Sequence, residues 1–378
     1  MREHTIRVKD TGTVYRNPMP HVRSRHAYFP SLVVLPDNEL LVVMDIGSAF
    51  EAHDIRSFAA RSTDGGRTWT EPVQLFEPSA DAGPTSVTTR VAAMPDGSLV
   101  GWVTSFDRSR PDLGLVNPQT DGLVRTNPAL TRSTDGGRTW STPRPIKPPV
   151  AWHTWEACSP VIPATDRRWL VPTSPQRSFE GEMPSLPPGL AFTSDDAGET
   201  WNDHVVLFDH DPSGVSALEL KLTRLSDGRW LAVCWSIDPT VGGPIPNRFT
   251  TSDPEAKAFE PARSTGIHGE TCTPLGLPDD HVLTVYRRYD QPGLWAQLAH
   301  LTDEWRPVAD QQLWSGSTYL PGGNSGGDVD RSASFIQMGG LQFGYPGVAR
   351  LPDGDCLVVF WCVERCVGNI RWIRLGLA

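Results

Sequence analysis

The chain has 378 residues and a formal net charge of −10. This acidic balance argues against nucleic acid or an anionic membrane surface as a partner. The segment from Met1 to Arg7 has no apolar core of the kind found in signal peptides, and no apolar run approaches membrane-spanning length, so we expect a cytoplasmic protein.

The first predicted element is a strand from Thr5 to Tyr15, where polar and apolar residues alternate weakly. Six copies of one pattern follow, in which an apolar strand ends in a turn of the Pro-Asp-Gly type and a second apolar strand begins. These turns start at Leu35, Met94, Pro163, Leu225, Leu277 and Leu351. Radial repetition of a hairpin is typical of a β-propeller.

We therefore predict an all-β fold, a six-bladed β-propeller of four-stranded antiparallel blades that forms a single domain over residues 1–378. The segment from Thr5 to Tyr15 would close the ring as the outermost strand of the last blade. The blades are expected to start near Tyr28, Thr88, Trp155, Leu218, Gly269 and Tyr345.

A second repeat, the Asp box, has the sequence Ser-Thr-Asp-Gly-Gly-Arg-Thr-Trp at residues 62–69 and again at 133–140, with a degraded copy at 194–201. Asp and Gly-Gly favour a tight turn in which the carboxylate accepts hydrogen bonds from turn amides. The Trp would cover the space between neighbouring sheets. We therefore interpret these residues as structural and place the motif between the third and fourth strands of a blade.

Three predicted connections are long for a compact domain, which is typical of functional loops or surface insertions. They run from Ser105 to Leu130, from Ser174 to Gly189 and from Asp303 to Gly340, the last including the Gly-rich segment 321–327. Four of the six cysteines fall within apolar strands, where buried free thiols are expected, and Cys362 and Cys366 have no second pair nearby. The sequence specifies no metal site, and we expect no cofactor.

The Asp boxes, the six hairpins and the segment from Tyr28 to Asp37 together resemble the sialidase (neuraminidase) superfamily, over nearly the whole chain. The resemblance implies a retaining glycosidase with a Tyr nucleophile assisted by a Glu, an Asp acid/base and three Arg residues that hold the substrate carboxylate. Tyr345 matches the nucleophile and Glu219 its assisting carboxylate. The acid/base would be Asp54 or Asp45, and Asp54 is preferred because it leads directly into the strand before the first Asp box.

The arginines depart from this pattern. Tyr28 stands where the family has the Arg of Phe-Arg-Ile-Pro, and Trp235 stands where the second Arg is expected. His268, Gly269 and Glu270 occupy the place of the third. Compensating candidates are Arg287, Arg288, Arg90 and Arg177. Because an Arg pair is the natural clamp for a carboxylate, we expect a substrate other than ordinary sialic acid.

The starts of the inner strands should line the mouth of the propeller, where ligand sites are favoured. With Asp45, Trp235 and Arg287, the expected substrate-binding residues there are His26, Tyr28, Arg90, His153, Trp155, Glu156, His268 and Glu270. This aromatic and acidic set suits the hydroxyls and apolar faces of a neutral sugar, so the expected partner is a carbohydrate.

Two alternatives to a glycoside hydrolase remain open at this point. A polysaccharide lyase would use His26, His153 or His268 with Tyr28 or Tyr345 to remove a proton beside a uronate carboxylate. A non-catalytic carbohydrate-binding propeller would have lost the arginines of an ancestral site. Fold alone does not decide among these functions.

Overall fold

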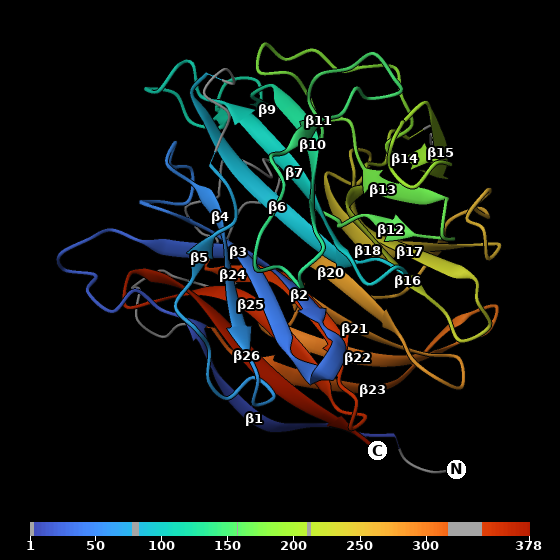
Figure 1. Ribbon diagram of the computed structural model, residues 1–378. Helices are drawn as coiled ribbons and strands as arrows, with labels where there is room; N and C mark the ends of the chain where they lie inside the picture. The colour runs from blue at the N-terminus through green and yellow to red at the C-terminus, as the bar shows by residue number, and fades with distance from the viewer. Residues whose placement is uncertain (1–3, 78–82, 157, 210–212, 317–341) are drawn as a thin grey trace.

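The structure is a computed structural model that describes residues 4–77, 83–156, 158–209, 213–316 and 342–378. The described strands form six four-stranded sheets arranged as the blades of a β-propeller (Figure 1), so the predicted fold is confirmed. A two-stranded hairpin, β8 (Val116–Asn117) with β9 (Gly122–Leu123), lies outside the blades. No helix in these ranges is both long enough and apolar enough to cross a membrane.

The first three blades follow one another along the chain, each read here from the inner strand outwards. Blade one consists of β2 (His26–Val34), β3 (Leu40–Gly47), β4 (Arg56–Ser62) and β5 (Val73–Gln74). Blade two consists of β6 (Thr85–Ala93), β7 (Leu99–Asp107), β10 (Thr126–Ser133) and β11 (Arg144–Pro145). Blade three consists of β12 (Ile162–Pro163), β13 (Trp169–Thr173), β14 (Gly189–Ser194) and β15 (Asp203–Phe208).

The last three blades continue the pattern. Blade four consists of β16 (Leu218–Arg224), β17 (Trp230–Asp238), β18 (Gly243–Ser252) and β19 (Arg263–Ser264). Blade five consists of β20 (Gly269–Gly276), β21 (His281–Arg288), β22 (Gly293–Leu301) and β23 (Trp305–Trp314). Blade six consists of β24 (Phe343–Arg350), β25 (Cys356–Glu364), β26 (Val367–Leu377) and β1 (Ile6–Tyr15).

The ring is closed by the first strand of the chain. β1 pairs antiparallel with β26, from Ile6 opposite Leu377 to Tyr15 opposite Ile370. Beyond the strands, the N–H of Thr5 donates to the carbonyl of Ala378 at 2.8 Å, and the reverse bond measures 3.1 Å. The two ends of the chain therefore lie side by side (Figure 1), and the expected closing strand is confirmed.

The repeated turns connect strands as their composition predicts. A 3₁₀ turn, η1 (Pro36–Asn38), joins β2 to β3. In the first Ser-Thr-Asp-Gly-Gly motif, the Asp64 carboxylate accepts hydrogen bonds from the N–H of Thr68 at 2.9 Å and from its hydroxyl at 2.6 Å. Asp135 and Asp196 make the equivalent bonds. These carboxylates stabilise turns at the outer part of the blades.

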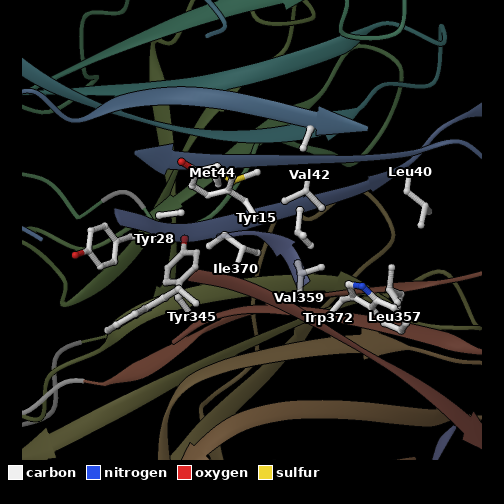
Figure 2. Close-up of a cluster of buried hydrophobic side chains, with 14 of the residues drawn as sticks. Tyr15, Tyr28, Leu40, Val42, Met44, Tyr345, Leu357, Val359, Ile370 and Trp372 are labelled. Atoms are coloured by element: carbon white, nitrogen blue, oxygen red, sulfur yellow. The ribbon is translucent and has the colours of Figure 1, made fainter. Parts of the chain in front are cut away.

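Apolar clusters fill the space between neighbouring blades. Between blades one and six, Leu40, Val42 and Met44 of β3 pack against Leu357 and Val359 of β25. Figure 2 shows this cluster extending from Tyr28 and Tyr345 at one end to Leu40, Leu357 and Trp372 at the other. Each fully buried aliphatic side chain contributes about 1.5–3 kcal/mol.

Two of the predicted long connections contain strands that the sequence analysis did not predict. Between β7 and β10 the chain forms the β8–β9 hairpin, and Asn117 Nδ2 donates to the carbonyl of Phe179, in the loop between β13 and β14, at 2.8 Å. The prediction of one long connection from Asp303 to Gly340 was wrong for its first part, because Trp305–Trp314 forms β23, the outermost strand of blade five. The Gly-rich segment 321–327 lies outside the described residues.

A bulge recurs at one level of the inner strands. The register of β2, β16, β20 and β24 shifts against the next strand at the same point in each blade. The residues at this point have a positive φ of 50–52°, and they are Phe29, Glu219, Thr271 and Tyr345. Bulges re-aim side chains, and positive φ in non-glycine residues costs of order 1–3 kcal/mol, which proteins typically accept at functional sites.

Candidate functional site

Side chains from opposite blades meet at the centre of the ring. The Tyr345 hydroxyl of blade six contacts Arg90 of blade two and the main-chain carbonyl of Cys158 in blade three. The Nζ of Lys221, from blade four, lies 3.8 Å from the centroid of the Tyr345 ring. Because these residues come from four different blades, they lie around the propeller axis. We call Asp45, Arg90, Glu156, Cys158, Glu219, Lys221 and Tyr345 the central cluster.

Arg90 links two members of the central cluster. Its Nη1 donates to Asp45 Oδ2 at 2.8 Å, and its Nε donates to the Tyr345 hydroxyl at 2.8 Å. Asp45 is fully buried and also accepts a bond from Ser57 Oγ at 2.8 Å. Burial raises the pKa of Asp45, and the charge of Arg90 opposes that rise. The buried ion pair therefore holds the Tyr345 ring in place through Arg90.

The main-chain carbonyl of Cys158 belongs to the segment that precedes β12 in blade three. It accepts hydrogen bonds from the Tyr345 hydroxyl and from Lys221 Nζ. Burial raises the pKa of Tyr345 well above its usual value. Tyr345 is therefore a neutral phenol that donates to a carbonyl.

Glu156 and Glu219 form a pair of carboxyl groups on adjacent blades. The N–H of Glu219 donates to Glu156 Oε2 at 2.6 Å. The Glu219 carboxylate in turn accepts a bond from Trp235 Nε1 at 3.1 Å, and the main-chain amide of Thr271 lowers its pKa. The bulges thus turn main-chain amides of blades four and five towards a carboxyl group of the preceding blade.

The two carboxyl groups of this pair have different surroundings. Burial, followed by the negative charge of Glu219, raises the pKa of Glu156 to about 7. Burial also raises the pKa of Glu219, but the positive charges of Lys221 and Arg287 oppose that rise. Paired carboxyl groups with raised pKa values are typical of acid–base sites.

The hydroxyl of Ser174 lies between Glu156 and blade four. Ser174 Oγ donates to the carbonyl oxygen of Ala217 at 2.7 Å and lies 3.1 Å from Glu156 Oε2. Its contact with Glu156 lowers the pKa of that carboxyl group, and so opposes the larger effect of burial.

Lys221 is a member of the central cluster that the sequence analysis missed. It is buried, and burial lowers the pKa of its amine to about 8. A signal was present in the sequence, since Glu219 and Lys221 alternate with leucines at 218, 220 and 222. Two polar residues on one face of an otherwise apolar inner strand must both find partners.

Two further predicted residues pair with each other beside the cluster. Glu270 and Arg287 form an ion pair in which both side chains are largely buried, at opposite positions on β20 and β21. Arg287 Nη1 also donates to the carbonyl of Phe343 at 2.9 Å. Arg90 and Arg287 are thus each matched by a carboxylate of the protein.

Asp54, the preferred acid/base of the sequence analysis, lies on the exposed loop between β3 and β4. Its Oδ1 accepts hydrogen bonds from the N–H of Ser48 at 2.9 Å and from its hydroxyl at 3.0 Å. These bonds close the loop, and the structure does not bring Asp54 into the central cluster. Its role as an acid/base stays a prediction.

The remaining predicted residues are spread around the cluster. Tyr28 packs edge-on against Phe50 and Trp361, with ring centroids 5.0 and 5.5 Å away. Trp155 is buried against Phe192. The structure therefore places these two aromatic residues in the apolar clusters.

The three predicted histidines lie in different parts of the structure. His26 Nδ1 accepts a bond from the N–H of Gly368 at 3.0 Å, and burial lowers the pKa of His26. His153 lines a side pocket of about 100 Å³ with Asp107, Arg110, Phe179 and others. His268 is exposed at the start of β20. Across the described ranges, no group of three or more His, Cys, Asp or Glu side chains is placed to hold a metal ion.

Comparisons with known proteins relate the chain to several propellers by fold. No protein-family model and no curated protein matches the sequence. A protein of unknown function from Dyadobacter fermentans has a similar structure, with a TM-score of 0.71, 19% identity and coverage of 99% of each chain. An α-L-arabinanase of Penicillium chrysogenum, solved with arabinobiose, has a TM-score of 0.65 and 14% identity over 97% of this chain and 98% of its own.

A mutant of the NanB sialidase from Streptococcus pneumoniae is similar at the same level. Its TM-score is 0.65 and its identity 13%, over 98% of this chain and 71% of the sialidase chain. The resemblance to sialidases is thus confirmed as a likeness of fold, which is shared with an arabinanase. At these identities the likeness defines the fold class, and the chemistry has to be argued from the site.

Proposed function

We propose that this protein is a retaining glycoside hydrolase that acts on a neutral glycoside and uses Glu156 and Glu219 as its catalytic carboxyl groups. The observation that carries the proposal is the contact between them, in which the Glu219 N–H donates to Glu156 Oε2 at 2.6 Å. The negative charge of Glu219 also raises the pKa of Glu156, which supports two carboxyl groups that lie close together. Retaining glycosidases have a separation of about 5–5.5 Å, shorter than in inverting enzymes.

The two glutamates have different roles, in which Glu156 is the acid/base and Glu219 is the nucleophile. Glu156, with a pKa of about 7, donates its proton to the glycosidic oxygen as the bond to the anomeric carbon breaks. Glu219, which faces the charges of Lys221 and Arg287, attacks the anomeric carbon and forms a glycosyl ester. Glu156 then takes a proton from the water that hydrolyses this ester, which restores both groups.

The ion pairs around the site support a neutral substrate. Arg90 and Arg287 are already matched by Asp45 and Glu270, so a substrate carboxylate would have to displace a protein carboxylate to bind either of them. Burying an unmatched carboxylate is costly. A neutral pentose or hexose avoids this cost, and arabinobiose, the ligand of the Penicillium arabinanase, is a natural first probe.

The test is hydrolysis of aryl glycosides of arabinofuranose, xylose, galactose, glucose and sialic acid, together with arabinobiose. For the best substrate, Glu156→Gln and Glu219→Gln should each lower kcat at least about 100-fold. Glu304→Gln, whose side chain is 72% exposed, should retain full activity. Proton NMR of the first product should show retained anomeric configuration. Full activity in either glutamine variant, or preferred cleavage of the sialoside, would contradict the proposal.

A further inference from the structure

The bulge in blade five places Thr271 in the same structural position as Glu219 and Tyr345. In each of these inner strands the register shifts by one residue, and the bulged residue has a φ of 50–52°. Thr is β-branched, so this conformation is a genuine outlier for it. Strain of this kind persists where the surroundings impose it, which is typical of functional sites.

Thr271 is already connected to the proposed site through its main chain. Its main-chain amide lowers the pKa of Glu219, the proposed nucleophile. Its side chain faces the start of β24, since Oγ1 lies 3.6 Å from the position that a Cβ on Gly344 would take, one residue before Tyr345. Thr271 therefore lies between the two bulged residues of blades four and six.

The hydroxyl of Thr271 lacks a partner in the described part of the chain. The residue is 7% exposed, and its Oγ1 makes no hydrogen bond there. An unpaired buried hydroxyl costs about as much as a lost hydrogen bond, so such groups usually have a partner. A donor or acceptor supplied by a ligand would remove this cost.

We propose that Thr271 is a substrate-binding residue, whose Oγ1 makes a hydrogen bond with a hydroxyl group of the bound sugar beside the Glu219 carboxylate. This inference rests on the proposed function and adds a specificity contact to it. The amide of Thr271 lowers the pKa of Glu219, and its hydroxyl binds the sugar unit that Glu219 attacks. The strained backbone supplies both contacts from one residue.

The test compares Thr271→Val, which removes the hydroxyl and keeps the shape, with Thr271→Ser, which keeps the hydroxyl. Thr284→Val is the matched control, because Thr284 is fully buried on β21 of the same blade and its Oγ1 also lacks a described partner. For the best aryl glycoside, Thr271→Val should raise KM about three- to tenfold, the effect of one hydrogen bond, while Thr271→Ser and Thr284→Val stay within about twofold. Thermal unfolding of each variant checks that it folds.

A set of monodeoxy glycosides sharpens this comparison. For wild type, the deoxy compound that lacks the contacted hydroxyl should have a KM higher than that of the parent glycoside, by the same roughly three- to tenfold factor. For Thr271→Val, the deoxy compound and the parent glycoside should have the same KM. If wild type hydrolyses the glycoside and Thr271→Val matches Thr284→Val, the inference is overturned and the proposed function stands. If wild type neither hydrolyses nor binds any glycoside of the panel, both are overturned.

Discussion

The main-chain N–H of Glu219 lies 2.6 Å from Oε2 of Glu156 and donates to it across the boundary between blades three and four. One blade further on, the main-chain amide of the bulged residue Thr271 lowers the pKa of the Glu219 carboxyl group. A regular strand would direct these amides into its own sheet. The bulges release them, so the distortion of the inner strands serves to organise carboxyl groups around the axis.

The raised pKa of Glu156 should make stability depend on pH. Its pKa is about 7 in the folded protein and 4.5 for an ordinary glutamate, so the folded state binds the proton more tightly. The resulting stabilisation is present below about pH 4.5 and is lost as the pH rises through about 7. Glu156→Gln should remove this loss. Urea unfolding at about pH 5 and about pH 8 should show a smaller fall for the variant than for wild type.

An equal fall in the free energy of unfolding for wild type and Glu156→Gln would contradict this prediction. Glu304→Gln is the control, because its exposed side chain should leave the pH dependence unchanged.

The Asp45–Arg90 pair should be strongly coupled. Replacing Arg90 with Met leaves the fully buried Asp45 carboxylate without its cation, which should cost about 3–5 kcal/mol of stability. Asp45→Asn should also destabilise the protein, by leaving Arg90 without its anion. The double variant should be less destabilised than the sum of the two single changes, as measured by urea unfolding in a double-mutant cycle. Additive effects would show that the pair is not coupled.

Lys221 should control the acidic limb of the pH–rate profile. Its charge lowers the pKa of Glu219, which has to be ionised to act as nucleophile. In Lys221→Met the pKa of Glu219 should rise, so the acidic limb of kcat/KM against pH should move to higher pH. Lys221→Arg, which keeps the charge, should move it less. An unchanged acidic limb in Lys221→Met would exclude this influence.

Tyr345→Phe should separate the two ways in which the site could form a covalent intermediate. The hydroxyl contacts Arg90 and the Cys158 carbonyl, so its loss disturbs the positions of both groups. If Glu219 is the nucleophile, the variant should keep a measurable fraction of kcat, reduced by roughly tenfold. A loss of kcat as large as in Glu219→Gln would favour the Tyr nucleophile implied by the resemblance to sialidases.

The fold could be predicted because its signals are local and repeated. The turns after Leu35, Met94 and Leu351 each connect the first two strands of a blade. β23 was missed because no such turn precedes Trp305 and its strand is largely exposed. The closing strand β1 could also be predicted, because the last sheet needs a further strand to cover its outer edge.

The residues of the central cluster could be predicted from the sequence only in part. Glu219 and Tyr345 were named from the family pattern, and both lie in the central cluster. The Cys158 carbonyl was missed because a main-chain group carries no residue-type signal, and its contacts with Tyr345 and Lys221 depend on tertiary packing. Asp45 is fully buried and pairs with Arg90, whereas Asp54 lies on an exposed loop, and this difference depends on the tertiary structure.

The pairing of β1 with β26 has a consequence for biosynthesis. β1 is the first of the described strands to be synthesised, whereas its partner β26, ending at Leu377, is the last of them. β1 therefore stays without this partner until all the other described strands have been made. Such a delay exposes a strand edge to wrong partners, and closing a loop of this length is slow. Blades one to five can pack before β26 is made, and the sixth is completed only when β26 pairs with β1.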